Sequence, residues 1–298
     1  MATPTTDARG VDGLVLLDKP AGISSHDAVL AARRASGEKR IGHAGTLDPF
    51  ATGLLVCLLG RATRLLPYLP GEPKVYEATL RFGAETDTED LAGTVTREAP
   101  LPDADAVRAA LARFTGPLMQ VPPAYSAKRV GGERAYAQAR AGVAVALAPV
   151  PIVVHALELL AWHGETCTLR VTCGGGTYVR SLARDLARDV GSAAHLVALR
   201  RTHAGPFAVA DAAPVPARGG PLAIRPPLDA LPHLPRVALA APEAARVRGG
   251  IAVRGEAPPG GSTHAALVAG EPAALVALAE WGDGKWHPRV VMRDAAGG

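Results

Sequence analysis

The feature that most constrains the fold is a series of short apolar segments of strand length that end at glycine or proline. Gly13–Asp18 is one such segment and is stopped by Pro20. Leu54–Leu59 is a second, and it follows a polar, glycine-rich loop. Thr166–Cys173 alternates apolar and polar residues and runs directly into three glycines. Each pattern is typical of a strand, so the chain is predicted to build a sheet whose strand ends are fixed by turns.

Helices are predicted between these strands. Ser24 or Ser25 can cap a helix that runs to about Ser36, where Gly37 terminates it. Further helices are predicted over residues 103–114 and 178–190. Strands and helices interleave without the regular alternation of a parallel sheet, and no internal repeat is present. We therefore expect a mixed α/β (α+β) fold.

The length of 298 residues fits one large domain with a small one, or two domains of similar size. Residues 1–10 are predicted to be a flexible tail, and residues 11–235 to form the main domain. Seven prolines fall between Pro214 and Pro235, which indicates either a linker or a packed irregular connection. Residues 236–298 contain short apolar stretches broken by glycines and are predicted to form a small β-rich domain.

Composition excludes several classes of protein. Hydrophobic residues make up 48% of the chain and charged residues 20%, which is incompatible with intrinsic disorder. No apolar stretch approaches the ~20 residues that span a bilayer, and the polar first ten residues lack the apolar core of a signal peptide. The three cysteines form no CxxC pair, which fits a reducing cytoplasm, the predicted location. The net charge of +4 does not by itself indicate a nucleic-acid partner.

The common cofactor motifs are absent from the sequence. It contains no P-loop, no GxGxxG after a strand, no HExxH and no GxSxG, and its histidines lack metal-ligand spacing. We therefore expect no metal and no cofactor.

Three polar segments next to strands are the candidates for a functional site. Asp48, between glycines and a proline, is either part of an ordinary turn or a carboxylate held rigidly as nucleophile or base. Tyr76, at the head of a strand, is either core or site. Residues 173–180 are either a helix start with glycine hinges or an anion site of backbone N–H groups beside Arg180.

Six sequence blocks that include these segments occur in a characteristic order. Together they resemble the bacterial tRNA pseudouridine-55 synthase (TruB) family. The blocks are DKPAGISSHDAV (18–29), GHAGTLDPFATG (42–53), KVYEA (74–78), PAYSAKRVGGERAYAQARAG (123–142), CGGGTYVRSLARDL (173–186) and LRRTHAGPF (199–207). Ala44 departs from the family, many of whose members carry threonine there.

The resemblance implies a pseudouridine synthase fold, with a central, mostly antiparallel sheet flanked by helices and a small C-terminal PUA-like RNA-binding domain. It also implies a reaction, the isomerisation of uridine 55 in the T-loop of tRNA to pseudouridine. The N1–C1′ bond breaks, the flipped base turns and a C5–C1′ bond forms, which needs no cofactor. The sequence leaves open whether the carboxylate bonds to C1′ or abstracts a sugar proton.

The family's site residues can be carried over where the blocks match. Asp48 is then the catalytic aspartate, Arg180 the arginine that orients it, and Tyr76 the tyrosine that stacks on the target base. His43 matches a histidine that contacts RNA near the flipped nucleotide, and loop packing is an equal alternative. Lys19 serves either the structure or contact with the RNA backbone.

Residues 123–152 resemble the family's thumb insertion. Its block contains four cations, which suit a clamp on the RNA backbone: Lys128, Arg129, Arg134 and Arg140. Tyr178 is a further candidate for substrate binding. The implied partner is the T-arm stem-loop of tRNA, with no membrane, no obligatory protein partner and a monomeric chain.

Two other functions are compatible with the same scaffold. One is a non-catalytic RNA-binding or tRNA-folding protein, which would not need Asp48, Tyr76 and Arg180, although all three are present. The other is a guide-RNA-dependent enzyme that acts with partner proteins. The bacterial-type thumb and the short C-terminal region argue against it.

Overall fold

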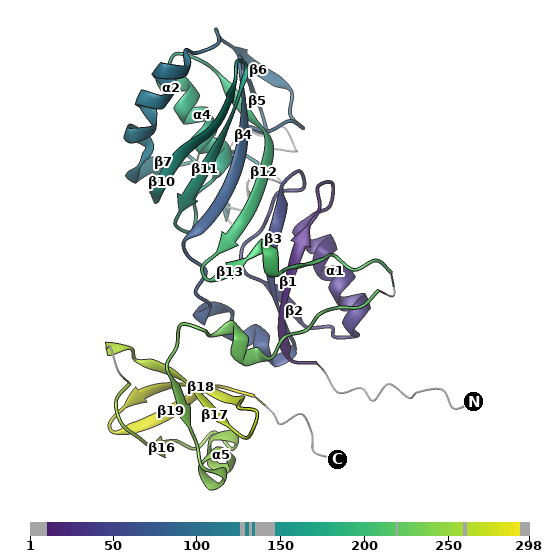
Figure 1. The fold of residues 1–298 in the computed structure, drawn as a ribbon, viewed down its shortest axis with the longest axis vertical. Coiled ribbons are helices and arrows are strands. Elements are labelled where there is room, and N and C mark those ends of the chain that lie inside the picture. The colour runs from purple at the N-terminus through teal and green to yellow at the C-terminus, as the bar shows by residue number, and fades with distance from the viewer. Residues whose placement is uncertain are drawn as a thin grey trace, which may run out of the picture.

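The computed structural model describes residues 11–125, 129–130, 133–134, 147–218, 220–258 and 261–292. Their fold is mixed α+β, as the sequence predicts, with one ten-stranded sheet and a separate five-stranded sheet near the C-terminus (Figure 1). The tail expected over residues 1–10 lies outside the described residues. The helices are α1 (Ser25–Ser36), α2 (Ala104–Leu111), α4 (Val179–Asp189) and α5 (Ala241–Arg248).

The large sheet is mostly antiparallel, as expected. Its two parallel pairings join β14 to β1 and β3 to β12. Two short strands, β2 (Ile41–His43) and β13 (Phe207–Ala208), pair with β3 and β12 outside the main path. Across the sheet the order is β14 (Ala213–Pro214), β1 (Gly13–Lys19), β3 (Thr52–Leu59), β12 (Ala194–Ala204), β4 (Lys74–Phe82), β11 (Thr166–Cys173), β10 (Val150–His163) and β7 (Gly116–Gln120).

The sheet has two halves that meet at a narrow seam. The first half contains β14, β1, β2 and β3, and the second contains β12, β4, β11, β10 and β7. Only two residue pairs join β3 to β12 in the ladder, Thr52 with Arg200 and Gly53 with Arg201. Gly53 has φ +101°, and a Cβ there would lie 2.3 Å from the Arg201 carbonyl oxygen, so the close approach at the seam requires glycine.

Helices cover one face of each half (Figure 1). α1 lies beside the first half, and α2 and α4 lie together against the second half. The capping predicted for α1 is confirmed: the Ser24 hydroxyl accepts the Asp27 N–H, the Asp27 carboxylate accepts the Ser24 N–H, and Gly37 ends the helix at φ 71°.

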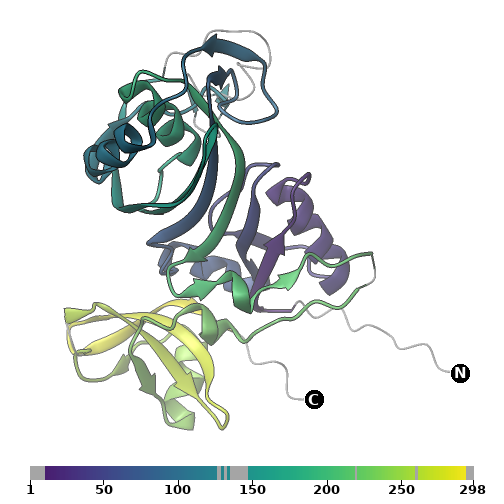
Figure 2. The same cartoon turned by 45° about the horizontal axis from the view of Figure 1, so that its top comes forward.

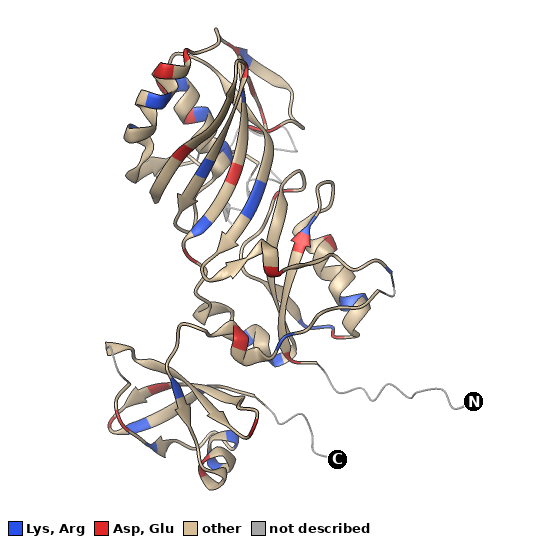
Figure 3. Ribbon diagram, viewed as in Figure 1, with Lys and Arg blue, Asp and Glu red and all other residues tan. Residues whose placement is uncertain are grey.

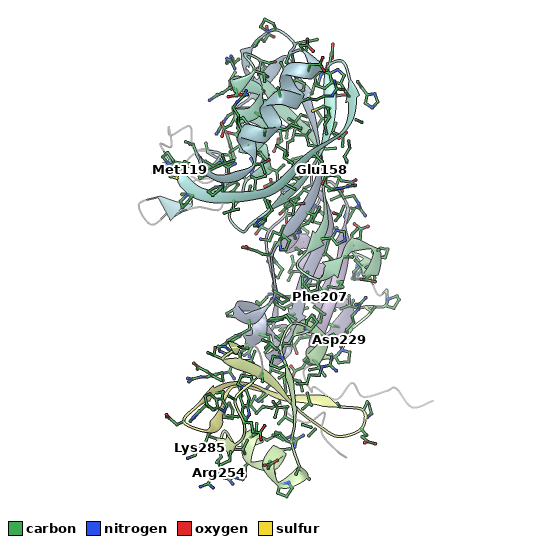
Figure 4. All side chains as sticks on the ribbon, turned by 60° about the vertical axis from the view of Figure 1, so that its left-hand side comes forward. Met119, Glu158, Phe207, Asp229, Arg254 and Lys285 are labelled. Carbon is green, nitrogen blue, oxygen red and sulfur yellow. The ribbon has the colours of Figure 1, made fainter. Side chains whose placement is uncertain are left out.

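The second half buries alternate residues of each strand. On β4, Tyr76 and Ala78 belong to the same buried core as residues of α4, whereas Glu77 lies on the opposite face. That opposite face carries interspersed charges (Figure 3), and Glu158 lies on it in Figure 4. Arg170 lies 3.7 Å from Glu77 and 3.4 Å from Glu158 there. The charged side chains of this face are therefore paired with one another and open to solvent.

The proline-rich segment is a packed irregular connection, one of the two predicted alternatives. Residues 213–214 pair with β1, the Arg225 and Leu14 backbones exchange hydrogen bonds, and Leu228 and Leu231 are buried. The 3₁₀ turn η4 (Pro227–Ala230) lies within this stretch, and η3 (Val209–Asp211) lies just before it.

The C-terminal unit is a five-stranded sheet with α5, and its β-rich character is as predicted. It lies below the first half in Figure 1 and keeps that neighbour in the turned view of Figure 2. One apolar core continues from β1 and β3 through Phe207 and Leu228 into Leu278 and Val290 of this sheet. The strands in order are β15 (Arg236–Ala238), β17 (His264–Ala269), β18 (Ala274–Gly282), β19 (Lys285–Val291) and β16 (Val253–Arg254).

Some elements differ from the sequence prediction. Gly116 and Pro117, which follow the predicted helix over residues 103–114, begin strand β7, and β12 was not predicted as a strand. The segment ERAYAQARA (133–141) also favours a short helix, and this prediction is wrong at its start, because Glu133–Arg134 is strand β9, paired with β8 (Arg129–Val130). Beyond Arg134, the expected helix lies outside the described residues. The remaining short elements are η1 (Gly60–Tyr68), β5 (Ala84–Thr86), β6 (Val95–Glu98) and η2 (Ala112–Phe114).

Candidate active site

The loop that carries Asp48 joins β2 of the first half to β3. On either side of Asp48, Leu47 and Ala51 are buried in the core of the second half, together with Tyr76. Asp48 itself remains 33% exposed in its side chain. The loop therefore crosses from one half of the sheet to the other, and it holds one carboxylate at the surface between two buried anchors.

Hydrogen bonds fix the backbone of this loop. The Ser25 hydroxyl accepts the Leu47 N–H at 2.8 Å and donates to the Leu47 carbonyl at 3.0 Å. The Pro49 carbonyl accepts the Gly22 N–H at 2.9 Å. The residues before and after Asp48 are thus tied to the start of α1, which leaves the carboxylate little positional freedom.

Arg180, in the first turn of α4, holds the carboxylate itself. Its Nε and Nη2 donate to the two oxygens of Asp48 at 2.9 and 3.1 Å, which is the bidentate pairing that guanidinium geometry favours. The arginine is only 4% exposed. It also donates to the carbonyls of Thr88, at 2.7 Å, and Tyr125, at 3.0 Å. A guanidinium fixed in this way dictates the orientation of the Asp48 carboxylate.

The acidic turn at residues 85–90 supports the position of α4. Glu89 accepts hydrogen bonds from Arg184 and Ser181, and Glu85 accepts a 2.9 Å hydrogen bond from Arg188. Burial raises the pKa of Glu89, and the Arg184 guanidinium opposes that shift. The acids of this turn therefore pair with successive turns of the helix that presents Arg180.

Tyr76 lies beside this pair on β4. It is buried, and burial raises the pKa of its phenol despite the opposing influence of the Arg201 guanidinium. The charge of Asp48 also acts on the phenol and favours its neutral form. Tyr76 is thus a protonated phenol close to a carboxylate, at the edge of the apolar core.

Lys19 lies at the end of β1 beneath the loop. The side chain is fully buried, and its Nζ donates to the carbonyls of Pro20, Ile23 and Pro49 at 2.9, 2.8 and 3.3 Å. Because its three donors are used on backbone oxygens, the geometry favours the structural alternative for Lys19. It ties the Asp48 loop to the turn before α1.

Burial of Lys19 makes the free energy of unfolding depend on pH in a direction that its lowered pKa determines. Burial lowers the pKa of Lys19 from 10.5 to about 8, against the opposing charges of Asp48 and Asp27. Between about pH 8 and 10.5 the unfolded chain keeps a proton that the folded chain has released, so folding becomes more favourable as the pH rises. We expect the free energy of unfolding of the wild type, relative to Lys19→Met, to increase through this window in urea titrations.

The exposed lysine Lys39 supplies the matched control for this measurement. The wild type relative to Lys39→Met should show no such increase. A difference between wild type and Lys19→Met that is flat with pH would contradict the assigned burial of the ammonium group.

The structure places the other candidate residues around the loop. His43 ends β2, and burial lowers its pKa with a further contribution from Arg201, which favours a neutral imidazole. The backbone of Tyr178 exchanges two hydrogen bonds with the Gln120 side chain, at 2.9 and 3.0 Å, at the start of α4. Lys128 and Arg140 lie outside the described residues, and for Arg129 and Arg134 only positions in β8 and β9 are described.

The glycine-rich loop before α4 is not open to an anion in this conformation. The Gly175 N–H donates to the Glu72 carboxylate at 2.6 Å, and the Gly174 N–H donates to the Val153 carbonyl. A Cβ on Gly175 would lie 2.3 Å from that carboxylate, so the contact depends on glycine. The loop is therefore fastened by an internal acid, and Glu72 already occupies the predicted anion site.

Two residues near the site were missed by the sequence reasoning. Lys74 shares a strand face with Tyr76, and strand periodicity alone could have revealed it. Burial and the neighbouring Arg201 lower its pKa. Arg201 is fully buried on β12, and nothing local in the sequence separates it from Arg200 beside it.

The assembled site combines an oriented carboxylate, a protonated phenol and buried cations. Such a site can supply an ionised carboxylate to an electrophilic carbon and a proton donor close to it. Among the described residues, no group of three or more His, Cys, Asp or Glu could hold a metal ion. The helices within these residues are all too short or too polar to cross a membrane.

Comparison with known proteins identifies relatives along nearly the whole chain. Residues 33–179 match the family model described as TruB family pseudouridylate synthase, N-terminal domain. The chain is 44% identical over 293 residues to tRNA pseudouridine synthase B of Parasynechococcus marenigrum, covering 97% of this chain and 99% of the relative. It is also 44% identical over 292 residues to the protein of the same name from Thermobifida fusca, covering 94% and 98%.

Solved structures share the fold at lower identity. A chain in the structure of an H/ACA RNP bound to a substrate RNA containing 2'-deoxyuridine superimposes with a TM-score of 0.68 and 22% identity. The match covers 95% of this chain and 86% of that chain. At this identity the similarity is one of fold.

Proposed function

The chain belongs to the TruB family of pseudouridylate synthases, and on that premise we propose that it converts uridine 55 in the T-loop of tRNA to pseudouridine. Membership of this family makes the protein an isomerase. tRNA as the substrate is supported by the relatives, which carry the name tRNA pseudouridine synthase B. The position within the T-loop rests on the sequence blocks that match the family.

The observation that carries the proposal is the Asp48–Arg180 pair. The reaction needs an ionised carboxylate at the sugar C1′ of the target nucleotide, comparable to the carboxylate of a retaining glycosidase. Both possible routes, bonding to C1′ and removal of a sugar proton, start from that species. Asp48 fits this requirement because it is bidentately paired to a buried arginine and one third of its side chain is open to a substrate.

Tyr76 is proposed to receive the flipped base. Extruding a base from folded RNA costs a few kcal/mol, and stacking on an aromatic ring returns about 1–3 kcal/mol. A phenol whose pKa is raised by burial stays protonated near neutral pH and can take part in a proton step. During the isomerisation C5 loses its proton and N1 gains one, so the product has the composition of the substrate.

RNA recognition is assigned to three parts of the chain. We propose that the basic thumb at residues 123–152 clamps the T-arm backbone, that His43 and Tyr178 contact the loop, and that the PUA-like unit at 236–298 binds RNA further away. Figure 4 shows Arg254 and Lys285 together at the end of that unit remote from the large sheet, where they are ladder partners. We further propose a monomer that works in the cytoplasm without a protein partner.

A tritium-release experiment tests the proposed function. The purified chain is incubated with a T-arm stem-loop labelled with tritium at C5 of the target uridine, without any guide RNA or second protein. Because the C5–H bond is replaced by C5–C1′, about one tritium should be released for each RNA. Release only after a guide RNA or another protein is added would contradict the autonomous function.

A matched RNA controls for the position. In this stem-loop the target is cytidine and the label sits in a neighbouring loop uridine. This control RNA should release no tritium. Release at the rate seen with the unaltered stem-loop would contradict the assignment of position 55. Binding of the intact stem-loop without any release would favour the tRNA-folding alternative.

A further inference from the structure

Arg201 lies where the two halves of the sheet meet. In the ladder its backbone is paired with Gly53 of β3 on one side and with Tyr76 of β4 on the other. The side chain is completely buried. Arg201 is therefore the residue of β12 that faces both Gly53, at the start of the strand that follows Asp48, and Tyr76, the proposed base-stacking tyrosine.

The guanidinium contacts groups on both sides of the seam. Its Nε donates to the Leu54 carbonyl at 2.8 Å, and its Nη2 donates to the Gly45 carbonyl, in the Asp48 loop, at 3.0 Å. Arg201 is also the ladder partner of Tyr76, and its charge acts on the buried Tyr76 phenol. One rigid, planar group thus links the strand that follows Asp48, the loop that precedes it and the tyrosine of the opposite half.

Gly45 shows how closely the guanidinium fits. It has φ +92°, and a Cβ there would lie 3.2 Å from Nη1 of Arg201 and 3.5 Å from Nζ of Lys74. The loop backbone is therefore packed directly on the guanidinium, with no side chain between them. A displacement of Arg201 would move the loop.

The charge of Arg201 is not needed for an ion pair. Within the described part of the chain, its side-chain hydrogen bonds go to two carbonyls, and no carboxylate lies within salt-bridge distance. Burying a cation without a counter-ion is costly, so an apolar side chain would serve packing alone at lower cost. A requirement for fixed donors explains the guanidinium better.

We propose that Arg201 is a positioning residue that sets the placement of the Tyr76 phenol relative to the Asp48 loop. Asp48 belongs to one half of the sheet and Tyr76 to the other, and the seam between them has only two ladder pairs. A misplacement of about 1 Å between reacting groups can cost about 10²-fold in rate. The link therefore acts on catalysis through geometry, and this inference rests on the proposed function of the same site.

The test compares substitutions on the two sides of one strand. Arg201→Met removes the donors, and Arg201→Lys retains the charge without the planar fork. We expect Arg201→Met to lower kcat on the T-arm stem-loop about 10²-fold with KM within about twofold of wild type. Arg201→Lys should recover part of kcat. A kcat equal to wild type in Arg201→Met would overturn the proposal.

Arg200 supplies the matched control. It also crosses the seam, with a bidentate pair to Asp18 of β1 at 2.8 and 3.0 Å, but it is 39% exposed and does not contact the site. Arg200→Gln should leave kcat within about twofold of wild type, since exposed pairs contribute about 0–1 kcal/mol. An equal loss in Arg200→Gln and Arg201→Met would show a general weakening of the seam and overturn the specific role of Arg201.

A second readout does not depend on the RNA substrate. The Arg201 cation favours ionisation of the nearby phenol, so its loss should raise the pKa of Tyr76 further. Ultraviolet titration of wild type and Arg201→Met, each with its Tyr76→Phe counterpart subtracted, measures that shift. An unchanged Tyr76 titration would overturn the contact, whereas an inactive wild type would contradict only the proposed function. If Arg201→Met does not fold, Arg201→Lys decides, with a reduced kcat expected and an unchanged kcat contradicting the proposal.

Discussion

Replacing Asp48 with asparagine is expected to abolish pseudouridine formation while the chain still folds and binds tRNA. The amide keeps the size of the side chain and can still meet Arg180, but it cannot act as an anionic nucleophile or base. Removal of a catalytic nucleophile or base typically costs about 10⁴-fold or more in kcat. Single-turnover tritium release measures the rate, and gel-shift titration of the T-arm stem-loop measures binding.

Asp18 provides a close control for this substitution. Its side chain is also 33% exposed and also bidentately paired to an arginine, Arg200, but it lies on β1 away from Tyr76. Asp18→Asn should react at close to the wild-type rate. Activity of Asp48→Asn near that of Asp18→Asn would refute the catalytic assignment, because both variants lose a paired carboxylate of equal exposure.

Arg180→Lys is expected to have the second-largest effect. Lysine retains the positive charge but cannot donate simultaneously to both Asp48 oxygens and to the carbonyls of Thr88 and Tyr125. A carboxylate that has lost its fixed orientation should react about 10²–10³-fold more slowly. The effect should appear in kcat, measured on the same stem-loop, with a smaller change in KM.

Arg184→Lys separates this effect from damage to α4. Arg184 lies one turn further along the helix, is 11% exposed, pairs with Glu89 and donates to the Val121 carbonyl at 3.0 Å. It does not contact Asp48. Arg184→Lys should lower the thermal midpoint about as much as Arg180→Lys does, but it should leave kcat of the folded enzyme close to wild type. Equal losses of kcat in the two variants would indicate a role for Arg180 in folding only.

Most of the local structure could be predicted because its causes are local. The Ser24 capping box and Gly37 define α1 within its own residues, and the alternation of Thr166–Cys173 matches the bounds of β11 in the structure. The strand β12 could not be found in this way. Its position at the centre of the sheet depends on β3 and β4, which lie far from it in the sequence.

The site residues were likewise predictable where they lie in local motifs and were missed where only long-range contacts define them. Asp48, Tyr76 and Arg180 stood out because each lies in a recognisable block, and 132 positions separate the two members of the ion pair. Arg201 was overlooked because it is held by two distant carbonyls and faces Tyr76 on a neighbouring strand, and none of these contacts leaves a sequence pattern. The glycine-rich loop misled for a related reason, since only the fold brings Glu72 to the Gly175 N–H.

The acidic residues of the 85–90 turn have a structural role that their contribution to the net charge does not reveal. Counted as charge, the residues of the 85–90 turn merely offset the basic thumb. In the fold, Glu85 and Glu89 pair with Arg188 and Arg184 on the helix that presents Arg180. A net charge cannot express such pairing, because it depends on which turns of a helix face which loop.

The apolar core shared by the first half of the sheet and the C-terminal unit has a consequence for how the chain melts. Leu54 of β3 and Leu278 of β18 belong to the same cluster, which continues through Phe207 and Leu228. Phe207 belongs to β13 of the large sheet, and Asp229, next to Leu228, lies between it and the C-terminal unit in Figure 4. Cutting the chain near residue 236 would expose that cluster to water, so the two units are coupled as one cooperative block and are not interchangeable modules on a tether. The C-terminal unit, although distant from Asp48 in the sequence, thereby contributes to the thermal stability of β3, the strand that follows Asp48.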